Sequence, residues 1–101
     1  MNVTVPKQGK VLHCYGADVQ SMIHMEECGE LIQAISKMRR IRNAGKDDTV
    51  AYRNLTEEMA DVLICLVQMQ ELYGIPDAEI QKRINRKCKR QEERMYQYQC
   101  D

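Results

Sequence analysis

Two short acidic motifs limit most strongly how this chain can fold. The first is E-E-C-G-E at residues 26–30, and the second is E-E-M-A-D at residues 57–61. Each motif contains two acids three residues apart: Glu27 with Glu30, and Glu58 with Asp61. Residues at this spacing project to the same side of a helix, so each pair marks one helix face.

Both pairs share their faces with apolar residues. In the first helix, the face of the acids also carries Gln20, Ile23, Leu31, Ala34, Met38 and Ile41. In the second helix, it carries Val62, Cys65, Met69 and Leu72. An ionised carboxylate on a core face is unfavourable unless it is paired or binds a metal ion. The four acids therefore predict a cation held between two helices.

The composition excludes several classes of protein. A chain of 101 residues forms one domain, and its formal net charge of zero gives no indication of a nucleic-acid or anionic-membrane partner. Five cysteines without a C-x-x-C motif, and a start that does not resemble a signal peptide, favour a reducing, cytoplasmic setting. The longest apolar run, residues 62–67, is far shorter than the roughly 20 residues that span a bilayer. We therefore expect a soluble, cytoplasmic protein.

Helical periodicity predicts an all-α fold, an antiparallel bundle of three to four helices. Residues 1–16 lack this periodicity and are expected to form an irregular N-terminal arm. A helical domain should follow over residues 17–96, with a tail at 97–101. Its first helix is predicted from about Asp18 to about Arg42.

The second helix carries the second acidic motif. Asn54, with Glu57 three residues later, resembles a capping box and predicts the helix start, after a polar connection over residues 43–54. Gly74 and Pro76 predict that the helix ends at about Tyr73. Because its apolar surface extends almost all the way round, we expect it to be central in one bundle or at an interface between copies.

The third helix, predicted from Pro76 or Asp77 to about Tyr96, is basic and has a thin apolar side. An open carboxylate cluster favours Mg²⁺, with Mn²⁺ as its surrogate, and such sites typically act on phosphates. Phosphates also need donors from the protein, and the candidates on this helix are Asn85, Lys87, Arg90 and Arg94.

Two other metals are rivals at the acidic motifs. Zinc would prefer His and Cys, and His24 with Cys28 is the only such pair at helical spacing. A di-iron bundle would need Glu-x-x-His twice, but neither His13 nor His24 follows a Glu at that spacing. Magnesium is therefore the expected ion.

These motifs resemble the MazG-like family of all-α nucleoside triphosphate pyrophosphohydrolases, particularly its short bacterial and phage members. The family pattern E-E-x-x-E-L, then E-E-x-x-D-V-L, is matched by residues 26–31 and 57–63. A third element, N-x-K-F-x-R, is met by residues 85–90, with Cys88 where an aromatic residue is usual. The resemblance extends from about Tyr15 to Arg94.

The resemblance implies Mg²⁺-dependent hydrolysis between the α and β phosphates, giving a nucleoside monophosphate and pyrophosphate for nucleotide pool control or housecleaning. The family's Mg²⁺ ligands correspond to Glu27, Glu30, Glu58 and Asp61, which would form the catalytic site. It also implies that Glu30 or Glu27 accepts the proton of the attacking water and that Lys87 and Arg90 bind the departing pyrophosphate. Family members form intertwined dimers or dimers of dimers, which implies a homodimer or homotetramer with sites at subunit interfaces.

The chain departs from its relatives in the residues available to bind the base. Relatives often stack the base on Trp or Phe, and this chain has neither. Tyr15, Tyr52 or Tyr73 would have to serve, while Gln20 and His24 are candidates for contacting base or sugar. The alternative for each is a surface or interface residue, and the sequence leaves the preferred nucleotide open.

Two other functions stay open. The first is a neighbouring phosphohydrolase that acts on dUTP and dUDP, or on a phosphoribosyl-linked intermediate, through the same metal site. The second is a helical interaction module that binds nucleic acid through the basic helix. Glu92 and Glu93 interrupt the basic run and stacking aromatics are absent until Tyr96, so this module ranks last.

Overall fold

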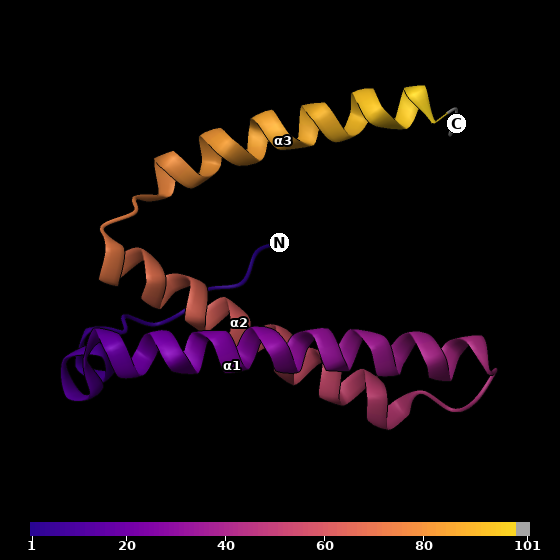
Figure 1. The fold of residues 1–101 in the computed structure, drawn as a ribbon, viewed down its shortest axis with the longest axis horizontal. Coiled ribbons are helices and arrows are strands. Elements are labelled where there is room, and N and C mark those ends of the chain that lie inside the picture. Colours follow the sequence, from indigo (N-terminus) through magenta and orange to yellow (C-terminus); the bar gives the residue numbers. More distant parts are fainter. Residues whose placement is uncertain (99–101) are drawn as a thin grey trace.

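The computed structural model describes residues 1–98, which form three α-helices and no strand. The helices are α1 (Gly9–Asn43), α2 (Thr49–Tyr73) and α3 (Asp77–Gln97), as Figure 1 shows. The all-α prediction is confirmed. The last three residues of the predicted tail lie outside the described residues.

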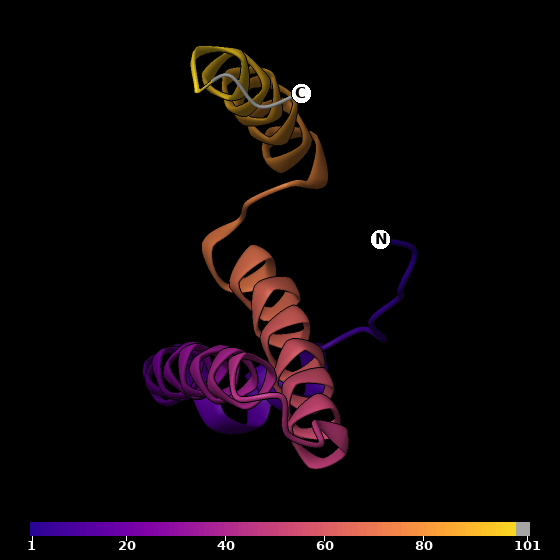
Figure 2. The same cartoon turned by 90° about the vertical axis from the view of Figure 1, so that its right-hand side faces the viewer.

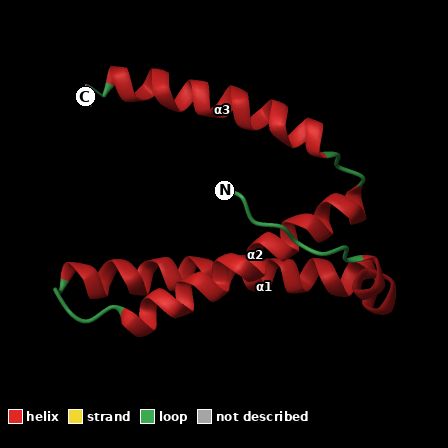
Figure 3. Cartoon of the chain, turned by 180° about the vertical axis from the view of Figure 1, so that it is seen from behind, coloured by secondary structure: helices red, strands yellow, loops and turns green. Residues whose placement is uncertain are grey.

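The first two helices form an antiparallel hairpin, with α2 returning across α1 at an angle (Figures 1 and 3). The buried apolar residues all lie in this hairpin and are mostly small: Leu12, Ala34, Met38, Ala51 and Cys65. Small side chains allow the two helices to approach closely where they cross. This close crossing positions the two acidic motifs.

A glycine interrupts α1 near its start. Gly16 has φ 81° and ψ 164°, so the helix is divided into a short first segment and a long second one. The expectation that residues 1–16 are irregular is therefore wrong for the residues from Gly9 onward, and within this N-terminal stretch the irregular arm is limited to residues 1–8. The short segment is stabilised by burial of Leu12, a tertiary contact that local periodicity does not reveal. The predicted domain boundaries stay a prediction.

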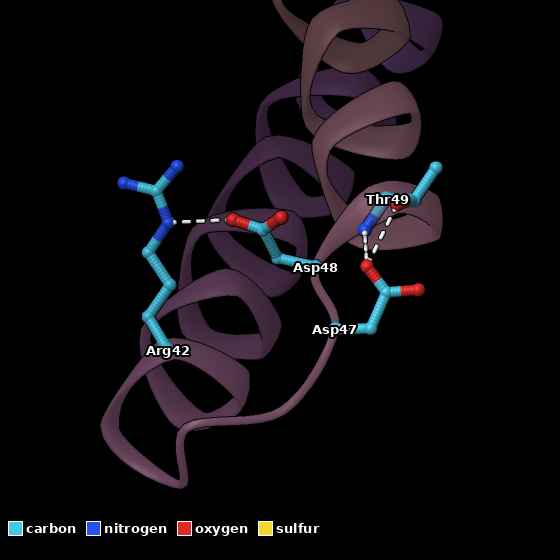
Figure 4. Close-up of polar contacts among 4 residues, drawn as sticks. All are labelled: Arg42, Asp47, Asp48 and Thr49. Carbon is cyan, nitrogen blue, oxygen red and sulfur yellow. Dashed lines mark hydrogen bonds and ion pairs between the residues drawn. The ribbon is translucent and has the colours of Figure 1, made fainter.

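The connection between α1 and α2 is shorter than expected, because α2 begins at Thr49 rather than Asn54. The Asp47 carboxylate accepts hydrogen bonds from the Thr49 backbone nitrogen at 3.2 Å and hydroxyl at 2.7 Å, and these bonds lower the pKa of Asp47 (Figure 4). Asp48 pairs with Arg42 at 2.8 Å. The predicted capping box is wrong, because α2 begins at Thr49, five residues before Asn54. The Asp47 carboxylate accepts the hydrogen bonds of Thr49 at this helix start.

The other helix boundaries are confirmed. Gly74 adopts a left-handed conformation with φ 64°, and its N–H donates to the carbonyl of Gln70. Pro76 then precedes the first residue of α3. A left-handed glycine followed by proline is a common way to end a helix and turn the chain.

The third helix stands apart from the hairpin (Figures 1 and 2). None of its described residues is buried, although Ile80 and Ile84 line an open apolar groove of about 710 Å³ shared with α2 and the N-terminal arm. Antiparallel packing of consecutive helices is thus confirmed for α1 and α2 but not for α2 and α3. Within residues 1–98, no helix combines the length and apolarity needed to cross a membrane.

Candidate metal centre

Three carboxylates meet where α1 and α2 cross. Glu27 of α1 and Glu58 and Asp61 of α2 each offer an oxygen, and these oxygens lie within 4.8 Å of one another. The antiparallel hairpin brings the two motifs opposite each other, as their apolar faces predicted. We call these three residues the acid cluster.

Glu30 lies at the edge of the acid cluster. Its side chain is exposed, but its charge is near enough to raise the pKa of both Glu27 and Glu58. For both residues desolvation is the largest cause, followed by the neighbouring carboxylates. Like charges held together disfavour ionisation. The four predicted ligands therefore interact electrostatically, although only three form the close group.

The acid cluster has two oxygens that need a partner. Glu27 Oε2 and Glu58 Oε2 are buried and, within residues 1–98, accept no hydrogen bond. Leaving buried carboxylate oxygens unpaired is costly, and nearly all such groups in native proteins are satisfied. A divalent cation would satisfy both, and an all-carboxylate set suits hard ions such as Mg²⁺ or Mn²⁺. The residues present therefore fit a bound metal ion.

A buried polar network lies beside the acid cluster. Gln20 and His24 are each 3% exposed, and both hydrogen-bond to Gln68 Oε1 at 2.8 Å. Gln68 in turn donates to Gln8 Oε1 at 3.0 Å. We call these four residues the amide network. His24 is not part of the acid cluster, and within residues 1–98 no group of three or more possible metal ligands includes His24 or Cys28.

The alternative that Gln20 and His24 are surface residues is wrong, because both are buried in the hairpin. Sequence reasoning also missed Gln68, which is only 5% exposed. The sequence feature that could have identified Gln68 is its place as a lone polar residue seven positions after Asp61, on the face that also carries Cys65. A polar residue at a core position generally needs a buried partner.

An open groove of about 500 Å³ runs along the hairpin next to the acid cluster. Its lining residues come from α1 and α2: Ser21, His24, Met25, Cys28, Gly29, Ile32, Met69 and Tyr73. Cys28 directly follows Glu27, and Gly29 directly precedes Glu30. We call this the hairpin groove. It includes His24 and Tyr73 but not Tyr52, which is 61% exposed, nor Tyr15, which is 58% exposed.

The basic candidates on α3 do not reach the acid cluster within one chain. Lys87, Arg90 and Arg94 line a small concavity on α3 itself, and Asn85 accepts a hydrogen bond from Gln81 at 2.9 Å. Figure 1 shows α3 well separated from the hairpin. The structure thus brings the predicted acids together and leaves the predicted phosphate-binding residues apart from them.

Comparison with known proteins places the chain in a family. Searches of curated proteins and of solved structures found no match. The sequence model of the MazG nucleotide pyrophosphohydrolase domain matches residues 19–96, a range that contains both acidic motifs and the basic helix. Since the match covers most of the chain, this protein belongs to the MazG nucleotide pyrophosphohydrolase family.

Proposed function

We propose that the protein is a Mg²⁺-dependent nucleoside triphosphate pyrophosphohydrolase that cleaves between the α and β phosphates to give a nucleoside monophosphate and pyrophosphate. The observation that carries this proposal is the acid cluster, with two buried carboxylate oxygens that accept no hydrogen bond from residues 1–98. Membership of the MazG family supports the reaction class.

In the proposed site, Glu27, Glu58 and Asp61 would hold the metal ion, with Glu30 completing the set. When bound, Mg²⁺ supplies positive charge that neutralises phosphate oxygens and stabilises the charge that develops on them. Without a cation the carboxylates repel each other. They would therefore hold the positive charge of the metal ion at the point where they meet.

One carboxylate must take the proton of the attacking water. Glu30 is the better candidate than Glu27, because it is exposed and borders the acid cluster, whereas Glu27 Oε2 is buried. Water attacks the α-phosphorus and gives its proton to Glu30. The bond from the α-phosphorus to the bridging oxygen breaks, and pyrophosphate leaves with the bond electrons.

Lys87 and Arg90, assisted by Asn85 and Arg94, would bind the departing pyrophosphate. Since α3 stands away from the hairpin of its own chain, we infer that these residues serve the acid cluster of another copy in a homodimer or homotetramer. Exposed apolar residues outside the hairpin groove support such an assembly, among them Ile35 at 51% and Met59 and Leu66 at 47% each.

The test is incubation of the purified protein with Mg²⁺ and a panel of ribo- and deoxyribonucleoside triphosphates, with pyrophosphate resolved from orthophosphate. Monophosphate plus pyrophosphate from any substrate supports the proposal. The panel includes dUDP and a phosphoribosyl-linked pyrophosphate, because cleavage of these alone would favour the neighbouring activities. Oligonucleotide binding that weakens with salt, without turnover, would instead favour the interaction module.

A further inference from the structure

The direction of every hydrogen bond in the amide network is fixed by one backbone carbonyl. Gln8 Nε2 donates to the Pro6 carbonyl at 2.9 Å, and a carbonyl oxygen can only accept. Gln8 must therefore turn its Oε1 to Gln68 Nε2, which donates at 3.0 Å. Gln68 Oε1 then faces the other two members, so it can only accept from Gln20 and His24.

This chain of bonds determines which nitrogen of His24 carries the proton. His24 Nε2 lies 2.8 Å from Gln68 Oε1 and must donate to it. An uncharged imidazole has a single N–H, so Nδ1 is left as an acceptor. Within residues 1–98, Nδ1 has no hydrogen-bond partner and is not among the fully buried atoms. His24 is among the residues that line the hairpin groove, and from this we infer that the free acceptor faces the groove.

The two hydroxyl groups of the hairpin groove have also used their protons. Ser21 Oγ donates to the Ala17 carbonyl at 2.7 Å. Tyr73 must therefore be the donor in the 2.6 Å bond between its hydroxyl and Ser21 Oγ. Both hydroxyls present only lone pairs to a ligand. The remaining lining residues are apolar, glycine or Cys28, whose thiol is a weak donor.

The hairpin groove therefore offers acceptors, and its position next to the acid cluster suits the nucleoside end of a triphosphate. His24 lies three residues before Glu27, a rise of about 4.5 Å along α1. Met25, Ile32 and Met69 supply the apolar and polarisable walls that suit a flat ring.

We propose that the hairpin groove is the nucleobase subsite of the reaction proposed above, on which this inference rests, and that it selects bases with an amino group at C4 of a pyrimidine or C6 of a purine. The amino group of cytosine or adenine donates to His24 Nδ1. Uracil and hypoxanthine present a keto oxygen at the same position, which would face an acceptor and leave both atoms unpaired. Gln68 acts as a positioning residue, because it fixes the His24 tautomer without touching the base.

The experiment compares two substrate pairs that differ at this position: dCTP with dUTP, and ATP with ITP. We expect kcat/KM to favour the amino member of each pair by about tenfold or more. In His24→Phe, which keeps a flat ring but removes the acceptor, the ratio should fall towards one. His13→Phe is the matched control, because His13 is exposed and does not line the hairpin groove, and its ratio should equal that of the wild type.

A second measurement tests the tautomer without turnover. The chain has two histidines, so the imidazole ¹⁵N signals of His24 are identified by their persistence in His13→Phe. We expect protonation at Nε2 in the wild type and a mixture of tautomers in Gln68→Met, which should also lose part of the amino preference. This pair of variants keeps the test open if His24→Phe does not fold.

The outcomes separate this inference from the proposed function. Pyrophosphate release with equal or reversed preference within the pairs, or an Nδ1–H tautomer in the wild type, would overturn the inference and leave the proposed function standing. No pyrophosphate from any triphosphate would overturn the proposed function, and the base subsite with it.

Discussion

The hairpin of α1 and α2 buries carboxylate oxygens where the two helices meet, whereas no described residue of α3 is buried. Glu27 Oε2 and Glu58 Oε2 are buried, close to other carboxylates and without a hydrogen-bond partner in residues 1–98. On α3, none of the described residues is buried, and Arg83 pairs with Glu79 in an exposed ion pair at 2.8 Å. Exposed pairs of this kind contribute little to stability, so α3 gains little from this ion pair.

This difference indicates two kinds of dependence. The acid cluster of the hairpin has two buried carboxylate oxygens that accept no hydrogen bond from residues 1–98, and α3 has no buried residue among those described. In the proposed enzyme a metal ion binds the carboxylates and a second copy of the chain covers the apolar side of α3. The predictions below test each dependence separately.

Removing a carboxylate from the acid cluster should have the largest effect. We expect Glu58→Ala and Asp61→Ala to lower kcat by a factor of about a thousand or more, because the charge that holds the metal ion is lost. Glu57→Ala is the matched control on the same helix, since Glu57 is exposed and outside the acid cluster. Steady-state pyrophosphate release measures the effect, and circular dichroism checks the fold. A fully active Asp61→Ala protein would contradict the proposed site.

The basic residues of α3 should have the next largest effect. We expect Arg90→Ala or Lys87→Ala to lower kcat/KM by about ten- to a hundredfold through lost phosphate contacts, with Mg²⁺ binding unchanged. Lys82→Ala on the same helix, outside the small concavity of α3, should be close to the wild type.

Mixing two impaired variants tests whether α3 acts on another copy. When Asp61→Ala and Arg90→Ala chains are mixed and allowed to exchange, half of the dimers are mixed and one of their two sites is intact. About a quarter of the wild-type activity should return. No recovery after exchange would show that each site is completed within one chain.

Metal binding should stabilise the hairpin in a pH-dependent way. Burial, and then the charges of neighbouring carboxylates, raise the pKa of Glu27 and Glu58 above the ordinary value of 4.5 in the metal-free protein. A carboxyl whose pKa is raised by folding supports the folded state at low pH and loses that contribution as the pH rises through the raised pKa. Metal-free protein should therefore become less stable as the pH rises through that range.

We expect Mg²⁺ or Mn²⁺ to reverse this loss, because in the proposed site it binds the deprotonated carboxylates of the folded form. We expect a rise of several degrees in Tm at neutral pH, a smaller rise near pH 4.5, and almost none in Glu58→Ala. Thermal melts with and without metal at both pH values measure this. Identical wild-type curves at neutral pH would count against the metal site.

The acids and the end of α2 followed from local patterns, whereas the remaining features depend on contacts between helices. The three-residue spacing of acids within each motif identified Glu27 in the first helix and Glu58 in the second. Gly74 marked the end of α2. The helical segment around Leu12 could not be predicted, because it is stabilised by burial rather than by its own periodicity. Gln68 escaped notice for a related reason: its partners Gln20 and His24 are 48 and 44 residues away.

Thiol reactivity offers the mildest test of the contrast between hairpin and α3. Burial, aided by the nearby charge of Glu27, raises the pKa of the Cys65 thiol to about 11, and only 4% of the residue is exposed. Thiolate is the reactive form, so Cys65 should be alkylated far more slowly than exposed Cys14 at neutral pH. Mass-spectrometric mapping after timed alkylation measures both rates.

The reactivity of Cys88 tests whether α3 is covered by another copy of the chain. It lies on the thin apolar side of α3 and is exposed in a single chain. If a second copy covers that side, Cys88 should be protected at high protein concentration and react faster on dilution, while Cys65 stays slow at every concentration. Cys88 labelling at the Cys14 rate regardless of concentration would mean that α3 has no covering partner, and Cys65 labelling at that rate would mean that the hairpin core is open.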